Sequence, residues 1–504
     1  MIKKVLAALK GVLGENITNQ IRPLGHGIKA LLAAAYFRFP ASKLTIIGVT
    51  GTKGKTSTTI YTGRLLNLSG IKSGYLSTAV VYDGSDQETN GNTKPFEELN
   101  IYKMTSLDGV TLHRSLRKMV NNGCKHVVIE LSSQGLAQNR HWGLGKIDIG
   151  VFLNIYPEHL EAHGGWDNYL KAKSILFNKL SSQGAFIAPS DDPNAEYMWD
   201  AIPRKDKVSK LLLTKGLDYK IKNQPTSEVQ LTFDGHILDH GFDAKFEAIN
   251  CAFALRVLTA INRKEVSKKD LKNIQYITEV PGRMEWVLKD NTLSKDPEYP
   301  VPKELKETSV LVDYAHEPES IRQLLETLVS WRKSSVFQHV IHILSCDGVG
   351  RDDWKKPVMG DISYMNADYV VLTTDNYSKE DNPNAIVDLL SKNFPKDQET
   401  KKFIKEVDRR KAFQKALDYS TKLKGEVLIV STGVGSEYGL SQPDGVMPWN
   451  ESQVWQKLIE EFDTKPTPAS ESKSKKPKSN TKKRDKKTRQ KNKKTSKKVT
   501  SSSK

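Results

Sequence analysis

The chain has few cysteines, and none of them stands in a paired motif. Cys124, Cys251 and Cys346 are the three cysteines in 504 residues, and long stretches of sequence separate them. A disulfide framework or a zinc knuckle requires cysteines at close and regular spacing. The sequence therefore argues against both kinds of site, and it predicts a cytoplasmic protein in a reducing compartment.

Long apolar runs are also absent. No window of about 18 residues is uninterruptedly apolar, so we predict no transmembrane segment. Near the start, the run VLAAL ends at Lys10 and no small-residue cleavage site follows, which argues against a signal peptide. The stretch GIKALLAAAYFRF (27–39) predicts a helix that packs on the body, and a helix lying on a membrane surface is the alternative.

The end of the chain has almost no acidic and no aromatic residues. Residues 464–504 hold 17 Lys or Arg and 2 acids, which is +15 of the net charge of +18 and leaves +3 for the rest. Such a segment cannot bury enough apolar surface to offset its ordering entropy, so we predict a disordered Lys-rich tail. It is either an electrostatic arm for a polyanion or a membrane surface, or a solubilising extension.

Two alternating patterns divide the rest of the chain. After a short N-terminal helical segment (1–42), β-branched runs such as LTIIGVT, HVVIEL and GAFIAP alternate with helical stretches over residues 43–278. A second series over residues 279–463 includes VIHILSC, ADYVVLTTD and GEVLIVSTG. This alternation is typical of βαβ units on mainly parallel sheets. We predict an α/β protein with a central domain on a mainly parallel sheet and a C-terminal Rossmann-like domain.

A glycine-rich turn, GVTGTKGKTST (48–58), follows the first predicted strand and precedes a helix. Gly51 and Gly54 let backbone N–H groups turn inward at the positive end of that helix, which favours an anion. Lys55 can reach the β- and γ-phosphates of a nucleotide, and the Thr56 hydroxyl can hold Mg²⁺. A purely structural glycine turn is the alternative. We predict an ATP-binding P-loop made of Gly51, Thr52, Gly54, Lys55, Thr56 and Ser57.

Polar residues follow two further predicted strands. Glu130 and Ser132 come at the end of HVVIEL, and His159 lies in NIYPEHLEAHGG after the next strand. Ligands of α/β proteins bind at the carboxyl ends of parallel strands. His159 alone is more typical of a surface histidine, but beside a phosphate loop and Glu130 it indicates a metal ligand.

Seven motifs follow one another along the chain. They are GVTGTKGKTS, ELSSQGL, NIYPEHLEAHGGWDNYLKAKSILF, VPGRMEW, VDYAHEPESI, DGVGRDDWKKPVMG and TTDNYSKED. Their order resembles that of the Mur ligase family, and they are most similar to its MurE branch, the UDP-N-acetylmuramoyl-tripeptide synthetases. Folylpolyglutamate synthases share the P-loop, but VPGRMEW and VDYAHEPESI resemble the MurE branch. The resemblance covers residues 43 to about 460.

The resemblance implies roles for individual residues. The implied catalytic residues are Lys55, Lys173, His159 and Arg283. Mg²⁺ would be held by Thr56, Glu130, His159 and Lys173, the last as a carbamate formed from a neutral amine and CO₂. ATP would also contact Asn250 at the adenine, Arg283 near the γ-phosphate and Asp313 near the ribose. The acceptor and amino-acid sites would include Ser132, Arg351, Asn376, Ser378, Gly433 and Glu437.

The implied reaction forms an amide bond at the expense of ATP. A carboxylate of a UDP-N-acetylmuramoyl-peptide precursor would become an acyl phosphate, and an amino acid would displace the phosphate. Such a ligase would serve peptidoglycan synthesis and have these small molecules as its partners. Two alternatives remain: a Mur-like ligase with another acceptor (a lipid-linked precursor, folate or a polymer), and a non-catalytic binding protein.

Three departures from the family motifs concern substrate recognition. Only 47 residues precede Gly48, so we expect no full UDP-binding domain there. The family's DNPR motif reads Asp375-Asn376-Tyr377-Ser378, without the arginine that holds a second carboxylate on the amino acid. The GKGHE motif reads Gly433-Val434-Gly435-Ser436-Glu437 and keeps only its glutamate among the charged residues.

Overall fold

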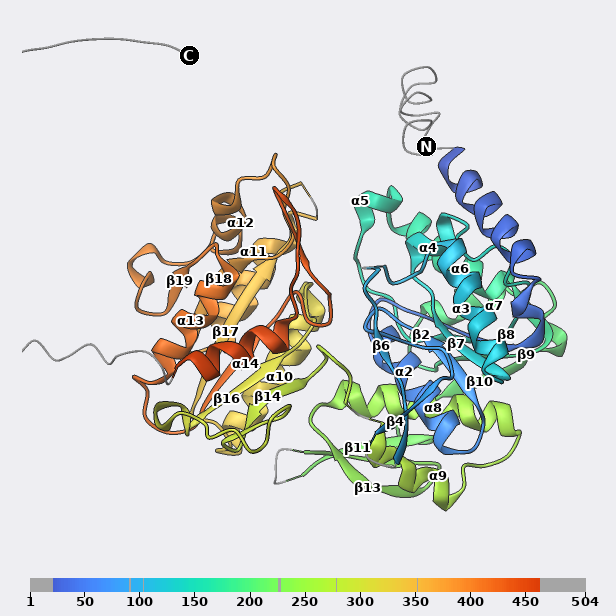
Figure 1. Ribbon diagram of the computed structural model, residues 1–504, viewed down its shortest axis with the longest axis horizontal. Coiled ribbons are helices and arrows are strands. Elements are labelled where there is room, and N and C mark those ends of the chain that lie inside the picture. Colours follow the sequence, from blue (N-terminus) through green and yellow to red (C-terminus); the bar gives the residue numbers. More distant parts are fainter. Residues whose placement is uncertain are drawn as a thin grey trace, which may run out of the picture. The chain divides into compact units, whose positions relative to one another are not determined.

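Figure 1 shows the computed structural model, which describes residues 21–89, 92–102, 104–224, 228–277, 279–350 and 352–462. The predicted tail, residues 464–504, lies outside the described residues, as does Arg351. The described part forms an α/β fold with two large sheets, which confirms the predicted fold class. The domain boundaries at residues 42, 278 and 463 stay a prediction.

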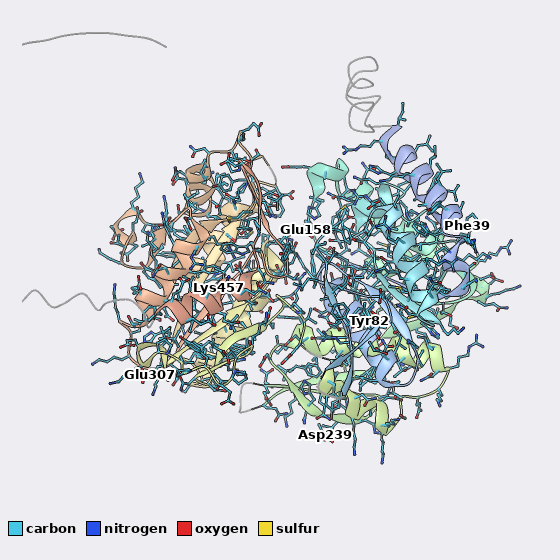
Figure 2. The ribbon with its side chains drawn as sticks, viewed as in Figure 1. Phe39, Tyr82, Glu158, Asp239, Glu307 and Lys457 are labelled. Atoms are coloured by element: carbon cyan, nitrogen blue, oxygen red, sulfur yellow. The ribbon has the colours of Figure 1, made fainter. Side chains whose placement is uncertain are left out.

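The central sheet has eight strands in the order β10-β9-β8-β1-β7-β2-β3-β6. The pairs from β10 to β2 are parallel, whereas β3 pairs antiparallel with both β2 and β6. Its strands are β1 (Thr45–Thr50), β2 (Ser73–Leu76), β3 (Val80–Tyr82), β6 (Glu98–Leu99), β7 (His126–Glu130), β8 (Ile147–Phe152), β9 (Leu180–Pro189) and β10 (Ser209–Leu213). Figure 2 marks Tyr82 on β3.

Helices cover this sheet, and two small antiparallel sheets are added to it. The helices are α2 (Lys55–Leu68), α3 (Gly109–Asn121), α4 (Ser133–Ala137), α5 (Leu160–His163), α6 (Trp166–Asn178), α7 (Asn194–Asp200), α8 (Lys245–Asn262) and α9 (Lys268–Lys272). The added strands are β4 (Asp86–Thr89) with β5 (Asn92–Pro95), and β11 (Tyr219–Asn223), β12 (Val229–Phe233) and β13 (His236–Phe242). Neither of these added sheets was predicted from the sequence.

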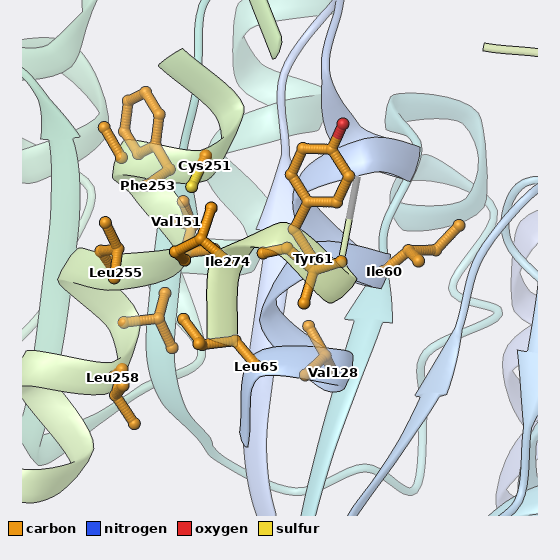
Figure 3. Packing of buried hydrophobic residues seen from close by; sticks show 14 of the residues in the cluster. Ile60, Tyr61, Leu65, Val128, Val151, Cys251, Phe253, Leu255, Leu258 and Ile274 are labelled. Atoms are coloured by element: carbon orange, nitrogen blue, oxygen red, sulfur yellow. The ribbon is translucent and has the colours of Figure 1, made fainter. Parts of the chain in front are cut away.

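The two faces of the central sheet bury different hydrophobic clusters. Successive side chains of a strand point to opposite faces. Ile47 and Val49 of β1 therefore pack with α2 and α8, whereas Ile46 packs with residues of α3 and α6. Figure 3 shows the first cluster, in which Leu65 of α2 and Leu258 of α8 lie near strand residues. Burial on both faces explains why these strands read as continuous apolar runs.

The first described helix spans residues 21–36 and packs on α3. The Arg117 guanidinium on α3 donates to the Phe37 carbonyl at 2.7 and 3.0 Å. A side chain at Gly109, the first residue of α3, would overlap Ala30. This arrangement matches the first of the two alternatives, a helix packed on the body. Among the described residues, no helix combines the length and the apolar character needed to cross a bilayer.

The second large sheet has seven strands in the order β15-β14-β16-β20-β17-β18-β19. The five strands from β16 to β19 in this order are parallel, and β14 joins antiparallel to both β15 and β16. The strands are β14 (Glu285–Lys289), β15 (Thr292–Leu293), β16 (Thr308–Val312), β17 (His339–Cys346), β18 (Tyr369–Thr374), β19 (Phe403–Lys405) and β20 (Val427–Ser431).

The remaining elements of this region are five helices and a hairpin. They are α10 (Pro318–Lys333), α11 (Lys355–Asn366), α12 (Pro383–Leu390), α13 (Arg409–Ser420) and α14 (Glu451–Phe462), with β21 (Leu440–Gln442) and β22 (Gly445–Met447). Short 3-10 helices occur at Pro40–Lys43, Lys205–Lys207, Asn273–Tyr276, Lys303–Leu305 and Lys396–Gln398.

Candidate active site

The glycine-rich turn joins β1 to α2 in a conformation that requires glycine. Gly54 has φ +79° and precedes α2, and a Cβ at this position would overlap the Asn250 side-chain oxygen on α8. Gly54 offers no side chain to cap the helix. The first N–H groups of α2 therefore face outward with the positive end of the helix dipole, which is an arrangement suited to phosphate.

Lys55 and Thr56 occupy the first turn of α2. The Lys55 ammonium donates to the Thr52 carbonyl at 2.8 Å. Burial lowers the pKa of Lys55, and the negative charges of Glu130 and Glu158 offset only part of this shift. The Thr56 hydroxyl lies 3.1 and 3.2 Å from the two Glu130 carboxylate oxygens. The buried Glu130 carboxylate also accepts from the Thr78 amide at 2.7 Å. A hydroxyl and a carboxylate thus lie together beside the turn.

Lys173 of α6 is buried beneath the same turn. Its ammonium donates to the Gly51 carbonyl at 2.6 Å and lies 4.6 Å from the centroid of the Tyr169 ring. Burial, together with the positive charge of Lys55, lowers the pKa of Lys173 well below its usual value. Burial therefore favours the neutral amine, the form that reacts with CO₂, over the ammonium.

The loop after β8 supplies acidic and imidazole groups. Glu158 lies 3.4 Å from the Lys53 ammonium and 3.2 Å from Nε2 of His316. His159 is half-exposed, and its ring nitrogens are each 3.7 Å from a carboxylate, one of Glu158 and one of Asp352. Across the described residues, no three His, Cys, Asp or Glu side chains gather at a metal-binding distance. Glu130 and His159 are therefore not joined in a preformed metal cluster.

Arg283 connects the turn to the second large sheet. Its guanidinium donates to the Thr56 hydroxyl at 3.3 Å and to the Ser436 hydroxyl at 3.0 Å. It lies over the Tyr314 ring, 3.9 Å from the centroid. Asp313 accepts from two backbone amides, those of Met284 at 3.0 Å and Ala315 at 2.8 Å. This carboxylate therefore also fixes the backbone at Met284 and Ala315.

The predicted amino-acid residues gather only in part. The Asn376 amide donates at 3.3 Å to both Asp347 and Glu437, and Glu437 also accepts from the Tyr314 hydroxyl at 2.6 Å. Ser378 instead donates to Asp381 from its amide and its hydroxyl, at 2.7 and 2.8 Å. Ser378 does not line the cavity that the other residues share.

A buried ion network supports this end of the site. The Arg409 guanidinium contacts Asp375 at 3.0 Å, the Thr432 carbonyl at 2.9 Å and Glu451 at 2.5 and 3.0 Å. Burial raises the pKa of Asp375 to about 7, although the charge of Arg409 opposes this shift. Arg409, Glu451 and Asp347 were not predicted from the sequence. Only Asp347 could have been found from the sequence, because it directly follows the predicted strand VIHILSC and so lies at the carboxyl end of a strand.

A second glycine contact joins the segment before β14 to the loop after β20. Gly282 has φ +64°, and a Cβ there would overlap the backbone of Gly435 and Ser436. The Gly282 amide donates to the Glu285 carboxylate at 2.6 Å. Two backbone segments distant in the sequence therefore touch directly at Gly282.

One cavity of about 1250 Å³ joins these groups. Its size suits a ligand as large as a nucleotide together with a second molecule. Gly51 contacts the site through its carbonyl rather than lining it. The predicted site residues that line the cavity are Thr52, Gly54, Lys55, Thr56, Ser57, Glu130, Ser132, His159, Lys173, Asn250, Arg283, Asp313, Asn376, Gly433 and Glu437.

The fold and this cavity define a ligase of the Mur type. Residues 49–257 match the Mur ligase middle domain, and residues 299–433 match the glutamate ligase domain of Mur ligases. The chain belongs to the Mur ligase family, and the resemblance inferred from the sequence is confirmed.

Two relatives that are similar to this chain over most of its length carry the same name. The chain is 31% identical over 412 residues, 81% of this chain and 75% of the relative, to a UDP-N-acetylmuramoyl-L-alanyl-D-glutamate–2,6-diaminopimelate ligase of Thermosynechococcus vestitus. A protein of the same name from Cytophaga hutchinsonii is 30% identical over 411 residues, 81% of this chain and 76% of the relative. At this level of similarity the chain is a ligase.

Solved structures show the same fold at low sequence identity. A folylpolyglutamate synthase of Mycobacterium tuberculosis complexed with ADP has a TM-score of 0.61 and 15% identity, covering 86% of this chain and 96% of that one. A MurF ligase from Thermotoga maritima in complex with ADP has a TM-score of 0.55 and 15% identity, covering 88% and 84%.

Proposed function

We propose that this chain uses ATP to join an amino acid to a carboxylate of a UDP-N-acetylmuramoyl-peptide precursor. One observation carries the proposal: the N-terminus of α2, Lys55, Lys173 and Arg283 all face one cavity that extends to Asn376 and Glu437. The first set suits the phosphates of a nucleotide, and the second suits a polar amino acid. The names of the relatives support the choice of acceptor.

The residues at the turn fit Mg²⁺, which prefers oxygen ligands. The Thr56 hydroxyl and the buried Glu130 carboxylate lie about one hydrogen bond apart, 3.1 Å at the shortest, and offer such oxygens. Lys173 would add two further oxygens as a carbamate, and the lowered pKa of its amine favours that modification. When bound, Mg²⁺ would supply positive charge for the phosphates of ATP.

The proposed reaction has two steps. A carboxylate oxygen of the acceptor attacks the γ-phosphorus of ATP, the bond to the β-γ bridging oxygen breaks, and ADP leaves. The amino group of the incoming amino acid then attacks the acyl carbon, inorganic phosphate leaves with the bonding electrons, and the amine loses a proton. The α2 amides and Lys55 would hold the phosphates, and Arg283 would neutralise charge on the transferring group.

The distal end of the cavity favours a positively charged group on the amino acid. Asp347 and Glu437 line the cavity and both accept from the Asn376 amide, whereas the carboxylate of Asp375 is already paired with Arg409. Lys355 is a cation of the same lining. An ammonium would be compensated there, whereas an additional carboxylate would be desolvated beside like charges. We therefore propose a diamino acid as the incoming substrate. Because the three cysteines are free thiols, we also propose that the reaction takes place in the reducing cytoplasm.

The test is ADP release by the purified chain with a panel of acceptors and amino acids. We expect ADP only when ATP, a muramoyl-peptide acceptor and an amino acid are all present, together with a new amide product by mass spectrometry. Lys55→Met should abolish release, whereas Lys171→Met, which changes an exposed lysine, should not. Release with folate or a lipid-linked precursor but with no muramoyl-peptide would refute the proposed acceptor.

A further inference from the structure

Helix 21–36 carries its largest apolar side chains on the side that faces away from the protein. A surface helix ordinarily presents polar residues outward. Here the face that packs on α3 and its surroundings uses small residues: Gly27 contacts Trp142, Ala30 lies against Gly109, and Ala34 lies against Gly143. The opposite side, which we term the outer face, consists of side chains that are 46–81% exposed. They are Ile21, Leu24, Ile28, Leu31, Leu32 and Tyr36.

These exposed residues form one stripe. At about 100° per residue, positions 21, 24, 28, 31 and 32 fall within roughly a third of the helix circumference. Phe39, which follows the helix and is 47% exposed, lies at the edge of the molecule in Figure 2. A contiguous apolar stripe of this length is larger than the scattered exposed residues normal for a protein surface.

Positive charges border the outer face. Arg22 and Lys29 are exposed and seven residues apart, so they lie on the same side of the helix, and Arg38 follows the helix end. From residue 16 to residue 82 the sequence contains no Asp or Glu. The acid that approaches the helix is Asp108 at the start of α3, 3.4 Å from the Lys29 ammonium. The face is thus apolar with a cationic border.

This combination distinguishes between two apolar partners. A second copy placed on the outer face by twofold symmetry would bring Arg22 and Lys29 of both copies close together, which is unfavourable. Anionic lipid headgroups would pair with these cations while the leucine and isoleucine side chains enter the acyl boundary. We propose that the outer face of helix 21–36 binds the surface of an anionic lipid bilayer. The site of ligation plays no part in this proposal.

A fluorescent probe on the outer face tests the proposal in the full chain. Leu32→Cys is labelled with an environment-sensitive dye, which is feasible because the three native cysteines are buried. Leu217→Cys, which replaces a 76% exposed leucine in the β10–β11 connection, is the matched control. With vesicles of equal phosphatidylglycerol and phosphatidylcholine, we expect a blue shift at position 32 and none at 217. With phosphatidylcholine alone, the shift at 32 should be much smaller.

Three results would overturn the proposal. Sedimentation with the anionic vesicles but no shift at 32 would mean that the Lys-rich segment 464–504 alone binds lipid. A shift at 32 that grows with protein concentration in the absence of vesicles would mean that a second copy covers the face. If the dye at 32 is already blue-shifted relative to the dye at 217 at every protein concentration without vesicles, another part of the chain covers the outer face.

Substitution on the outer face gives an independent measurement. Leu24→Gln with Ile28→Gln should lower vesicle partitioning by about tenfold or more in 0.5 M salt, which screens charge but leaves apolar transfer intact. Leu217→Gln with Ile237→Gln, at positions 76% and 61% exposed, should leave partitioning unchanged. ADP release without vesicles should be the same in both pairs, and equal partitioning of the two pairs would refute the proposal.

Discussion

Replacing Arg409 by methionine should destabilise the protein by about 3–5 kcal/mol. That range is typical when one partner of a buried ion pair is removed, because the other charge stays buried and unpaired. Arg409 is 2% exposed at its side chain, and it contacts two carboxylates, Asp375 (5%) and Glu451 (0%). Methionine fills much of the same volume, so the loss reports on charge and hydrogen bonding rather than on a cavity.

The size of this loss should depend on pH in a defined direction. Burial raises the pKa of Asp375 to about 7 in the folded protein, above its ordinary value of 3.8. The folded state therefore binds this proton more tightly than the unfolded state, and the contribution of Asp375 to stability falls as pH rises from 3.8 towards 7. Without Arg409 the pKa of Asp375 rises further. The variant then loses stability with pH more steeply than the native protein.

The pH effect can be given a magnitude. In the native protein Asp375 loses its proton between pH 6 and pH 8, since its pKa is about 7. A variant in which Asp375 stays protonated over this range loses about 1.4 kcal/mol more stability than the native protein. The assay is urea unfolding at the two pH values, followed by tryptophan fluorescence. Trp449 donates to Glu451 at 2.7 Å and Trp455 stacks on Phe413, so both report on this region.

The neighbouring arginine provides the control. Arg410 makes an exposed pair with Glu461, with side chains 41% and 56% accessible, and such pairs contribute about 0–1 kcal/mol. Arg410→Met should therefore have a small effect at both pH values. A cost of Arg409→Met below about 1 kcal/mol, or an equal cost at pH 6 and pH 8, would contradict the role of the buried ion network.

Three further predictions concern the proposed reaction. Lys173→Ala should abolish ligation with the fold intact, and a small carboxylic acid should restore part of the activity; full activity of the variant without rescue would contradict the carbamate role. Deleting residues 464–504 should leave turnover of a small acceptor nearly unchanged, and a large fall that is insensitive to salt would show otherwise. Lysine should be preferred to meso-diaminopimelate in kcat/KM, since the carboxylates of Asp347 and Glu437 line the cavity and oppose a second carboxylate on the substrate; a tenfold preference for diaminopimelate, about 1.4 kcal/mol, would refute this.

The parallel part of the fold was predictable from the sequence, and the antiparallel additions were not. Strands such as β1 and β7 are buried on both faces, so they leave a continuous apolar run between recognisable turns. By contrast, β11 (YKIKN) and β12 (VQLTF) alternate apolar with polar residues and form no continuous apolar run. Their β-sheet structure depends on pairing with each other, which the sequence does not display.

The site residues that a local sequence pattern marks were predicted, whereas those defined by contacts between distant residues were not. Lys55 and Thr56 were located because the turn and the helix start are adjacent in sequence. Arg409 was not located, because its partners Asp375 and Glu451 are 34 and 42 residues away. Ser378 was placed in the amino-acid site because it stands at the arginine position of the DNPR motif, but a tight turn directs its hydroxyl to Asp381. Sequence proximity does not define the direction of a side chain.

The glycine contact at residue 282 has a consequence for how this chain can change in evolution. Gly282 adopts φ +64° and lies against the backbone of Gly435 and Ser436, so alanine would be opposed both by its own backbone conformation and by a rigid neighbour. Backbone atoms, unlike a flexible side chain, have little room to retreat. A deep mutational scan should therefore find Gly282 as intolerant as Lys55, and a ranking by tolerance alone would mistake this junction for a substrate-binding position.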